Sequence, residues 1–197
     1  WYHFSSGVFD NWTNLDSHCV VHQIPNSWES NKYSLYIEGY DAGTTYITQK
    51  RAVLWGYASM NVHTKVKFYG YNTLKLNFRI YYPDGTLNLV YQQGTSSWNT
   101  PGGGTSDGDY TIDKDSNAQD KEINLDLPFW NTPTFGIGIG NPQPMTIEVR
   151  VIDPGDANSD TDRPAGITNP GVEVGPISLT FKYNDVIGDT LTIDNPK

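Results

Sequence analysis

Aromatic residues in loops are the first candidates for chemistry in this sequence. The 197-residue chain contains six tryptophans, and two of them lie in expected loops away from the irregular N-terminal stretch. Trp98 lies in the glycine-rich stretch 94–109, and Trp130 lies between two expected strands. A flat aromatic ring stacks on the C–H face of a pyranose, while neighbouring polar groups bind its hydroxyls. Trp98 and Trp130 are therefore predicted sugar contacts, although both could instead fold back as apolar plugs over the ends of a sandwich.

A row of polar residues on one expected strand forms a second candidate surface. The row comprises Lys75, Asn77, Arg79 and Tyr81, with His63 and Lys65 of the preceding expected strand beside it. These residues alternate with apolar ones, so the two sets occupy opposite faces of the strands. The polar face is predicted to point outward, where Asn77, Arg79 and Tyr81 could bind a glycan. A solvated outer face or a protein interface is an equally open interpretation.

Acidic residues in a long loop near the C-terminus have the spacing of a calcium site. The predicted ligands are Asp153, Asp156, Asn158, Asp160 and Asp162. Oxygen ligands at alternate positions are typical of the start of a calcium-binding loop. The match departs from an EF-hand, because Thr161 replaces the required glycine and Ile167 replaces the bidentate glutamate. An irregular structural Ca2+ site is one interpretation and a solvated acidic loop is the other. A poorer match spans residues 113–120.

Catalytic motifs find little support, and no catalytic residue is predicted. His18 and His22 flank the single cysteine. On a strand they would lie about 13 Å apart, too far to share a metal ion. Among the carboxylates, Glu38, Glu122 and Glu148 are the least implausible for a β-sandwich glycosidase. That mechanism needs two carboxylates about 5–10 Å apart, which a sequence cannot establish.

The charge balance limits the classes of partner. The formal net charge is −9 and charged residues make up 18% of the chain. A basic excess to neutralise phosphates is missing, which argues against nucleic acid and against an anionic membrane surface. Neutral glycans and other protein subunits remain as expected partners. The sequence has no apolar run of about 18 residues, so membrane insertion is not expected.

The chain begins at Trp1 and carries no recognisable signal peptide, so we expect it to be processed or excised from a longer chain. One cysteine allows no intrachain disulfide and does not fix the compartment. An extracellular or virion-surface location is compatible with both features.

Short strands must position these residues. The stretch 71–82 alternates apolar and polar residues and is followed by the turn sequence Pro83–Thr86. The stretch 62–68 alternates in the same way, so the centre of the chain is predicted to form consecutive antiparallel strands. Including the other alternating stretches, we expect about nine or ten strands and no helix. This pattern predicts an all-β, antiparallel, jelly-roll-like sandwich.

Two long loops interrupt the expected strands. Residues 94–109 are rich in glycine and serine, and residues 153–175 are acidic and broken by prolines. Loops of this length in a compact domain are usually functional or disordered. With no internal repeat and a length within the range of large sandwiches, residues 1–197 are predicted to form one domain.

The strand Gly70–Phe78 resembles a strand of the galactose-binding-like jelly-roll modules. Trp28 and Tyr33–Leu35 resemble the strand that precedes it in those modules, and Ile147–Asp153 resembles a late strand. The resemblance spans about residues 9–153, and residues 154–197 add a loop and closing strands. It implies a carbohydrate-binding module or a domain of a phage tail or virion protein.

Three hypotheses follow for the function. The first is a non-catalytic module that binds polysaccharide or cell-surface glycan through loop aromatics. The second is a structural virion protein, from a capsid, tail or decoration jelly roll, whose loops make subunit contacts. The third and weakest is a β-sandwich glycan hydrolase or lyase.

Overall fold

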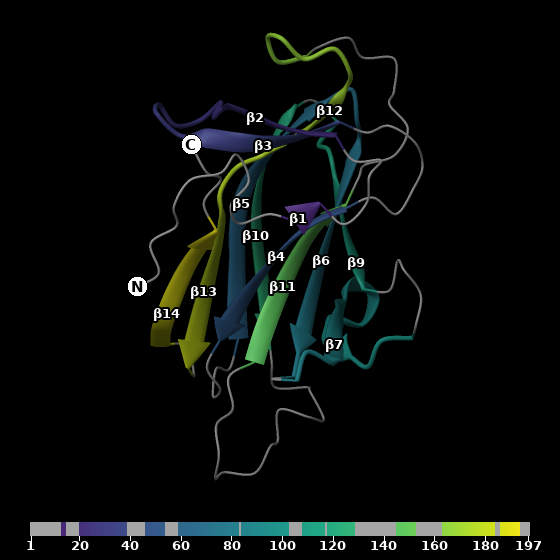
Figure 1. The fold of residues 1–197 in the computed structure, drawn as a ribbon, viewed down its shortest axis with the longest axis vertical. Helices are drawn as coiled ribbons and strands as arrows, with labels where there is room; N and C mark the ends of the chain where they lie inside the picture. The colour runs from purple at the N-terminus through teal and green to yellow at the C-terminus, as the bar shows by residue number, and fades with distance from the viewer. Residues whose placement is uncertain are drawn as a thin grey trace.

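A computed structural model describes most of the strand-forming part of the chain (Figure 1). The described residues are 13–14, 20–38, 46–53, 59–82, 84–102, 108–116, 118–128, 145–152, 163–183 and 186–193. They form fourteen strands and one short 3-10 helix, Gln93–Thr95. The strands assemble into two seven-stranded sheets in which every paired strand is antiparallel. The predicted all-β antiparallel sandwich is confirmed.

Sheet A contains the strand that carries the predicted polar row. Its strands in spatial order are β1 (Thr13–Asn14), β4 (Tyr46–Val53), β11 (Met145–Ile152), β6 (Thr73–Tyr81), β7 (Leu87–Gln92) and β8 (Ser97–Asn99). The remaining strand, β9 (Asp109–Asp113), pairs with the first half of β6, while β7 pairs with its end. Figure 1 shows β4, β11 and β6 side by side, with β9 and β7 beyond β6. Strand β6 is therefore flanked by partners on both edges.

Sheet B is built around the longest strand, β5 (Ser59–Tyr69). One edge of β5 pairs with β10 (Asp120–Pro128). The other edge pairs first with β13 (Ile177–Tyr183) and then with β12 (Gly171–Val174). The sheet continues from β13 to β14 (Val186–Ile193), and from β12 to β3 (Tyr33–Glu38) and β2 (Val20–Pro25). The strands that follow residue 154 thus pair within sheet B.

The core lies between the sheets and follows the alternation of the sequence. On β6, Leu74, Leu76, Phe78 and Ile80 are at most 2% exposed. On β5, Met60, Val62, Val66 and Phe68 are fully buried against them. Burying these apolar side chains contributes roughly 1.5–3 kcal/mol each. The predicted inward faces of both strands are confirmed.

The two predicted long loops contain strands that the sequence did not reveal. Within 94–109, the chain forms the 3-10 helix and then β8, which pairs back onto β7. Within 153–175, β12 inserts between β3 and β5, and all four of its residues are buried. Strand β12 is too short for a periodic signal, and it carries a buried glutamate that a sequence pattern assigns to a surface. No helix in the described part of the chain is long and apolar enough to cross a membrane.

Candidate functional site

The polar row of β6 lies on the outer face of sheet A, opposite the core. The sequence predicted a wet face, but most of the row is shielded from solvent. Asn77 is fully buried, and Arg79 and Tyr81 are each 8% exposed. The row lies in the middle of the sheet, with β11 along one edge of β6 and β9 and β7 along the other. Polar neighbours from β9 and β11 surround the row, so it belongs to a network rather than to a solvated surface.

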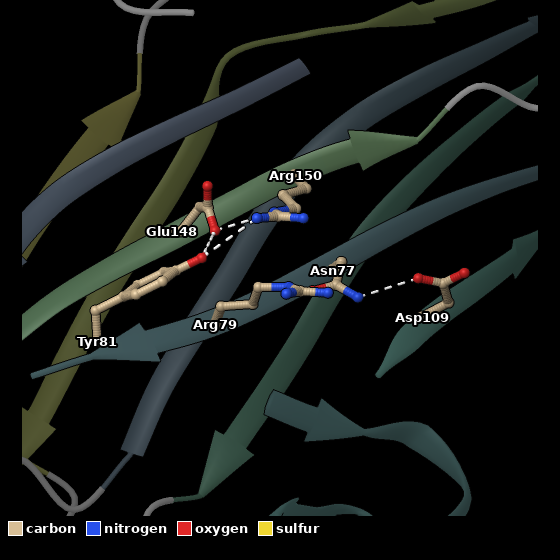
Figure 2. Close-up of polar contacts among 6 residues, drawn as sticks. All are labelled: Asn77, Arg79, Tyr81, Asp109, Glu148 and Arg150. Carbon is tan, nitrogen blue, oxygen red and sulfur yellow. Dashed lines mark hydrogen bonds and ion pairs between the residues drawn. The ribbon is translucent and has the colours of Figure 1, made fainter. Parts of the chain in front are cut away.

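Tyr81, Glu148 and Arg150 form one half of this network (Figure 2). The Tyr81 hydroxyl donates a hydrogen bond to Glu148, which is fully buried. Arg150 Nε donates to Glu148 Oε2 at 3.0 Å, and Arg150 Nη2 donates to the Tyr81 hydroxyl at 3.3 Å. Burial is the largest cause that raises the pKa of Tyr81, and its hydrogen bond to Glu148 raises the pKa further. Tyr81 therefore remains a neutral hydrogen-bond donor at physiological pH.

Arg79, Asn77 and Asp109 form the other half. Arg79 Nε donates to Asn77 Oδ1 at 2.8 Å, and Asn77 Nδ2 donates to Asp109 Oδ1 at 3.0 Å. The ammonium of Lys75 lies 3.8 Å from Asp109 Oδ2. The oxygen and the nitrogen of the Asn77 amide thus connect the Arg79 guanidinium on β6 to the Asp109 carboxylate on β9. The amide is a link that fixes the orientation of both neighbours.

We call these seven residues the sheet A network: Lys75, Asn77, Arg79, Tyr81, Asp109, Glu148 and Arg150. Its members differ in exposure, and Lys75 is the most exposed of them. Glu148 is inaccessible, the Arg150 side chain is 12% exposed and the Lys75 side chain is 44% exposed. The network is therefore shielded over most of its length and open to solvent at Lys75, because the Asp109 side chain is only 11% exposed. A ligand that contacts the network would approach from the open end.

Trp98 is a core residue, which contradicts its prediction as an exposed sugar platform. It lies at the centre of β8, opposite Tyr91 on β7, and is 1% exposed. The two rings meet edge to face, with their centroids 5.5 Å apart. Ser96 ends the 3-10 helix in the left-handed conformation, and the chain then pairs back onto β7. The alternative interpretation, an apolar plug, is the one that the structure supports.

The other predicted site residues lie outside the described residues. They are Trp130 and the candidate calcium ligands Asp153, Asp156, Asn158, Asp160 and Asp162. The calcium site stays a prediction, for which a melting midpoint lowered by chelator would be the evidence. In the poorer acidic match, Lys121 Nζ lies 3.0 Å from Asp115 Oδ1 and donates to the Asp113 carbonyl at 2.6 Å. Among the described residues, no group of three or more metal-binding side chains is present.

Two members of the network were missed by sequence reasoning. Arg150 falls on the polar side of the alternation in 145–151, and Asp109 ends the expected loop 94–109. Their place beside β6 depends on strand pairing, since Arg150 and Asp109 both lie directly opposite Asn77 in the register. Alternation shows which face a residue occupies but not which distant strand lies next to it. The available signal was the alternation of polar residues on 145–151.

The outer face of sheet B carries a different polar cluster with a structural role. Glu173, which is fully buried, accepts hydrogen bonds from Ser27 N at 2.9 Å, Ser27 Oγ at 2.6 Å and the Tyr69 hydroxyl at 3.3 Å. Nearby, Glu38 accepts from Asn169 Nδ2 at 2.9 Å and lies 2.8 Å from His22 Nε2. These bonds hold the turn after β2 and the segment before β12 against the sheet.

The three carboxylates considered for a glycosidase are not brought together. Glu38 lies on β3 and Glu122 on β10, with β12 and β5 between them in sheet B. Three strand spacings separate these two strands by about 14 Å. Glu148 lies on the outer face of sheet A, on the opposite side of the sandwich. None of these pairs has the separation that the mechanism requires.

Comparison with known proteins returns matches of fold only. No protein-family model matches the chain, and a search of curated proteins finds no match. Among solved structures, the chain is similar to the CBM22-1 xylan-binding domain of Paenibacillus barcinonensis Xyn10C. The identity is 10% and the TM-score 0.43, over 89% of this chain and 88% of that one.

Two further matches have comparable scores. The family 11 carbohydrate-binding module of the Clostridium thermocellum cellulase Lic26A-Cel5E is 12% identical, with a TM-score of 0.40 over 85% of this chain and 84% of that one. The enzymatically active domain of tailspike protein 4 from bacteriophage CBA120 is 12% identical, with a TM-score of 0.43. This match covers 83% of the present chain but 18% of the tailspike chain. The chain thus resembles the jelly-roll sandwiches that its sequence suggested, and at TM-scores below 0.5 the likeness carries no argument about its ligand.

Proposed function

We propose that this chain is a carbohydrate-recognition module that binds sugar at the outer face of sheet A without catalysing its cleavage. The observation that carries the proposal is the sheet A network itself. Within it, carboxylate oxygens, an amide, a phenol and three cationic groups lie on adjacent positions of β6, β9 and β11. Sugar hydroxyls both donate and accept hydrogen bonds, so a mixed set of this kind suits them.

The rigidity of the network supports a binding role. Its side chains are held by one another, so a ligand would meet groups whose orientation is already fixed. Lys75, whose side chain is 44% exposed, is the group that an incoming sugar would meet first, and Asp109 lies beside it. Tyr81 adds an aromatic ring at the closed end. We expect such a module to meet its glycan outside the cell or on the surface of a virion.

Retention on immobilised polysaccharides tests this proposal. The purified chain is passed through gels that contain xylan, β-glucan, galactan or polygalacturonate, and its mobility is compared with that in an empty gel. We expect retardation by at least one polymer. Lys75→Met should weaken that retardation about two- to tenfold, the effect of losing one partly exposed hydrogen bond.

Lys182→Met is the matched control, because Lys182 is a partly exposed lysine on the outer face of sheet B, 3.9 Å from Asp126. It removes the same charge from the opposite side of the sandwich and should leave binding unchanged. Equal effects of the two variants would contradict the assigned site. Absence of retardation by every polymer, together with a defined homo-oligomer in size-exclusion chromatography, would favour the subunit-contact alternative. Release of new reducing ends from a bound polymer would favour the enzymatic one.

A further inference from the structure

Arg79 carries a buried positive charge that the described part of the chain leaves without a counter-ion. Its side chain is 8% exposed, and Nε donates to the neutral amide of Asn77. The two terminal nitrogens make no hydrogen bond or ion pair with any described residue. Removing a guanidinium from water is unfavourable unless an anion or several acceptors replace the water. The terminal groups are therefore available to a ligand that supplies those acceptors.

The nearest carboxylate in the sheet is directed away from Arg79. Glu148 stands directly across from Arg79 in the pairing of β11 with β6. Side chains at such positions are close enough for an ion pair. Glu148 instead accepts hydrogen bonds from Arg150 and Tyr81, and the Asn77 bond draws the Arg79 guanidinium along β6 (Figure 2). The network thus uses its buried carboxylate internally and leaves Arg79 uncommitted.

The pairing of charges in the network indicates the chemical class of the ligand. Within the network, Lys75, Arg79 and Arg150 are positive and Asp109 and Glu148 are negative, and Asp113 adds a third carboxylate to the same face of β9. Lys75 lies beside Asp109 and Arg150 is bonded to Glu148, so Arg79 is the remaining cation. The chain as a whole carries −9, but charges beyond about 10 Å are screened at physiological salt. The guanidinium of Arg79, which has no carboxylate partner among the described residues, is therefore the feature that points to an anionic ligand.

We propose that the sheet A network binds an acidic glycan and that Arg79 receives the carboxylate of a uronic acid residue. This inference rests on the proposed function and names its ligand class. The planar fork of an arginine matches a carboxylate in a bidentate arrangement. Lys75, at the open end, attracts the same anion as it enters. Asn77 is a positioning residue, because it orients the guanidinium without needing to touch the sugar.

Pairs of polymers that differ only in their carboxylates test this inference. Polygalacturonate, alginate and hyaluronan are each compared with the product in which the carboxyl groups have been reduced to alcohols, and dextran sulfate is the sulfated control. We expect at least one native uronate polymer to bind the wild-type chain tenfold or more tightly than its reduced form. Arg79→Met should weaken that binding about tenfold to a hundredfold, as expected for a charge-assisted hydrogen bond.

Arg79→Lys keeps the charge without the fork and should bind with intermediate affinity that decreases as salt is raised. If Arg79→Met does not fold, the comparison of native with reduced polymers and the affinity of Arg79→Lys test whether Arg79 binds a carboxylate. Equal binding of native and reduced polymers, or binding of dextran sulfate alone, would overturn the inference. If Lys75→Met still weakened binding to the reduced polymer, the proposed function would survive that result. Absence of binding to every polymer, acidic or neutral, would overturn both.

Discussion

Asn77 shows how a single residue can determine the chemistry of a sheet face. It is fully buried, and its amide accepts from Arg79 and donates to Asp109. An isosteric aspartate would keep the acceptor but would turn the bond to Asp109 into a repulsion between carboxylates. It would also neutralise Arg79. The neutral amide therefore preserves the positive charge of Arg79 that the acidic-glycan proposal requires.

Trp98 should contribute to stability rather than to recognition. Because its ring is 1% exposed and packs on Tyr91, Trp98→Ala would leave a large cavity in the core. We expect the free energy of unfolding to fall by about 3–5 kcal/mol, as is typical for tryptophan truncation in a core. Trp98→Phe, which keeps an aromatic ring, should lose less. Urea denaturation followed by circular dichroism measures both.

The contrary outcome for Trp98 is equally specific. An unchanged urea midpoint for Trp98→Ala, combined with loss of retention on a polysaccharide gel, would support Trp98 as a sugar contact instead. Loss of retention that merely parallels the unfolded fraction would not, because an unfolded chain binds nothing specifically.

At the scale of the strand, alternation predicted the faces of β5 and β6 correctly. Val62, Phe68, Leu76 and Phe78 all face the core as expected. This succeeds because a period of two is a local property, and a shift of one residue would expose the whole apolar set. The same alternation placed Asn77 and its neighbours on the outer face, but it gave no information about what would surround them there.

The features that sequence reasoning missed depend on contacts between distant segments. Asp109 and Arg150 reach Asn77 from strands 32 and 73 residues away in sequence, through pairings that no local pattern specifies. The sequence around Trp98 indicates a loop, because its strand has only three residues and lies in a glycine-rich stretch. Strand β12 was missed for the same reason. Short strands acquire their structure from the sheet that they join rather than from their own propensity.

Gly171 is the position at which β12 depends on the absence of a side chain. A Cβ at Gly171 would lie 2.3 Å from the Ile37 carbonyl oxygen and 2.7 Å from the Tyr36 ring. The carbonyl belongs to the paired strand β3 and cannot move without disturbing the register. We therefore expect Gly171→Ala to lower the free energy of unfolding by about 1–3 kcal/mol, as overpacking does in other cores. The urea midpoint of the variant tests this.

Gly94→Ala is the matched control for the glycine prediction. A Cβ at Gly94 would meet nothing within 4 Å, and the residue is exposed in the 3-10 helix. The same substitution there should change stability by no more than about 0.5 kcal/mol. If the two variants had equal midpoints, the close approach of β12 to β3 would not be a constraint on the fold.

Considered as a whole, the molecule has polar groups buried on the outer faces of both sheets. In sheet B the buried carboxylate of Glu173 is fully engaged by Ser27 and Tyr69, and the cluster holds covering segments in place. In sheet A the terminal nitrogens of Arg79 have no partner among the described residues, and the network is exposed at Lys75. The two faces therefore differ in whether their buried charged groups are fully hydrogen-bonded to other groups of the described chain. This difference is the reason for proposing a recognition role for sheet A rather than for sheet B.

Buried tyrosines on both sheets should make the fold sensitive to alkali. Burial is the largest cause that raises the pKa of Tyr36, Tyr69, Tyr81 and Tyr91 above the ordinary value near 10. A raised pKa means that the folded state disfavours the phenolate. The contribution of these neutral tyrosines to stability is fully present below pH 10. It is lost as the pH rises through their raised pKa values in the folded state. We expect the urea midpoint to be steady from neutral pH to about pH 9 and to fall steeply above pH 10.

Tyrosinate absorbance separates this cause from general charge repulsion. The buried tyrosines should ionise in a phase that coincides with loss of the circular dichroism signal. Added salt screens repulsion between surface charges but does not restore water to a buried phenol, so this phase should persist in high salt. Titration of all thirteen tyrosines in one reversible phase near pH 10, with an unchanged urea midpoint, would contradict the burial of these side chains. Because Tyr81 belongs to the sheet A network, ligand binding should be lost in the same pH range.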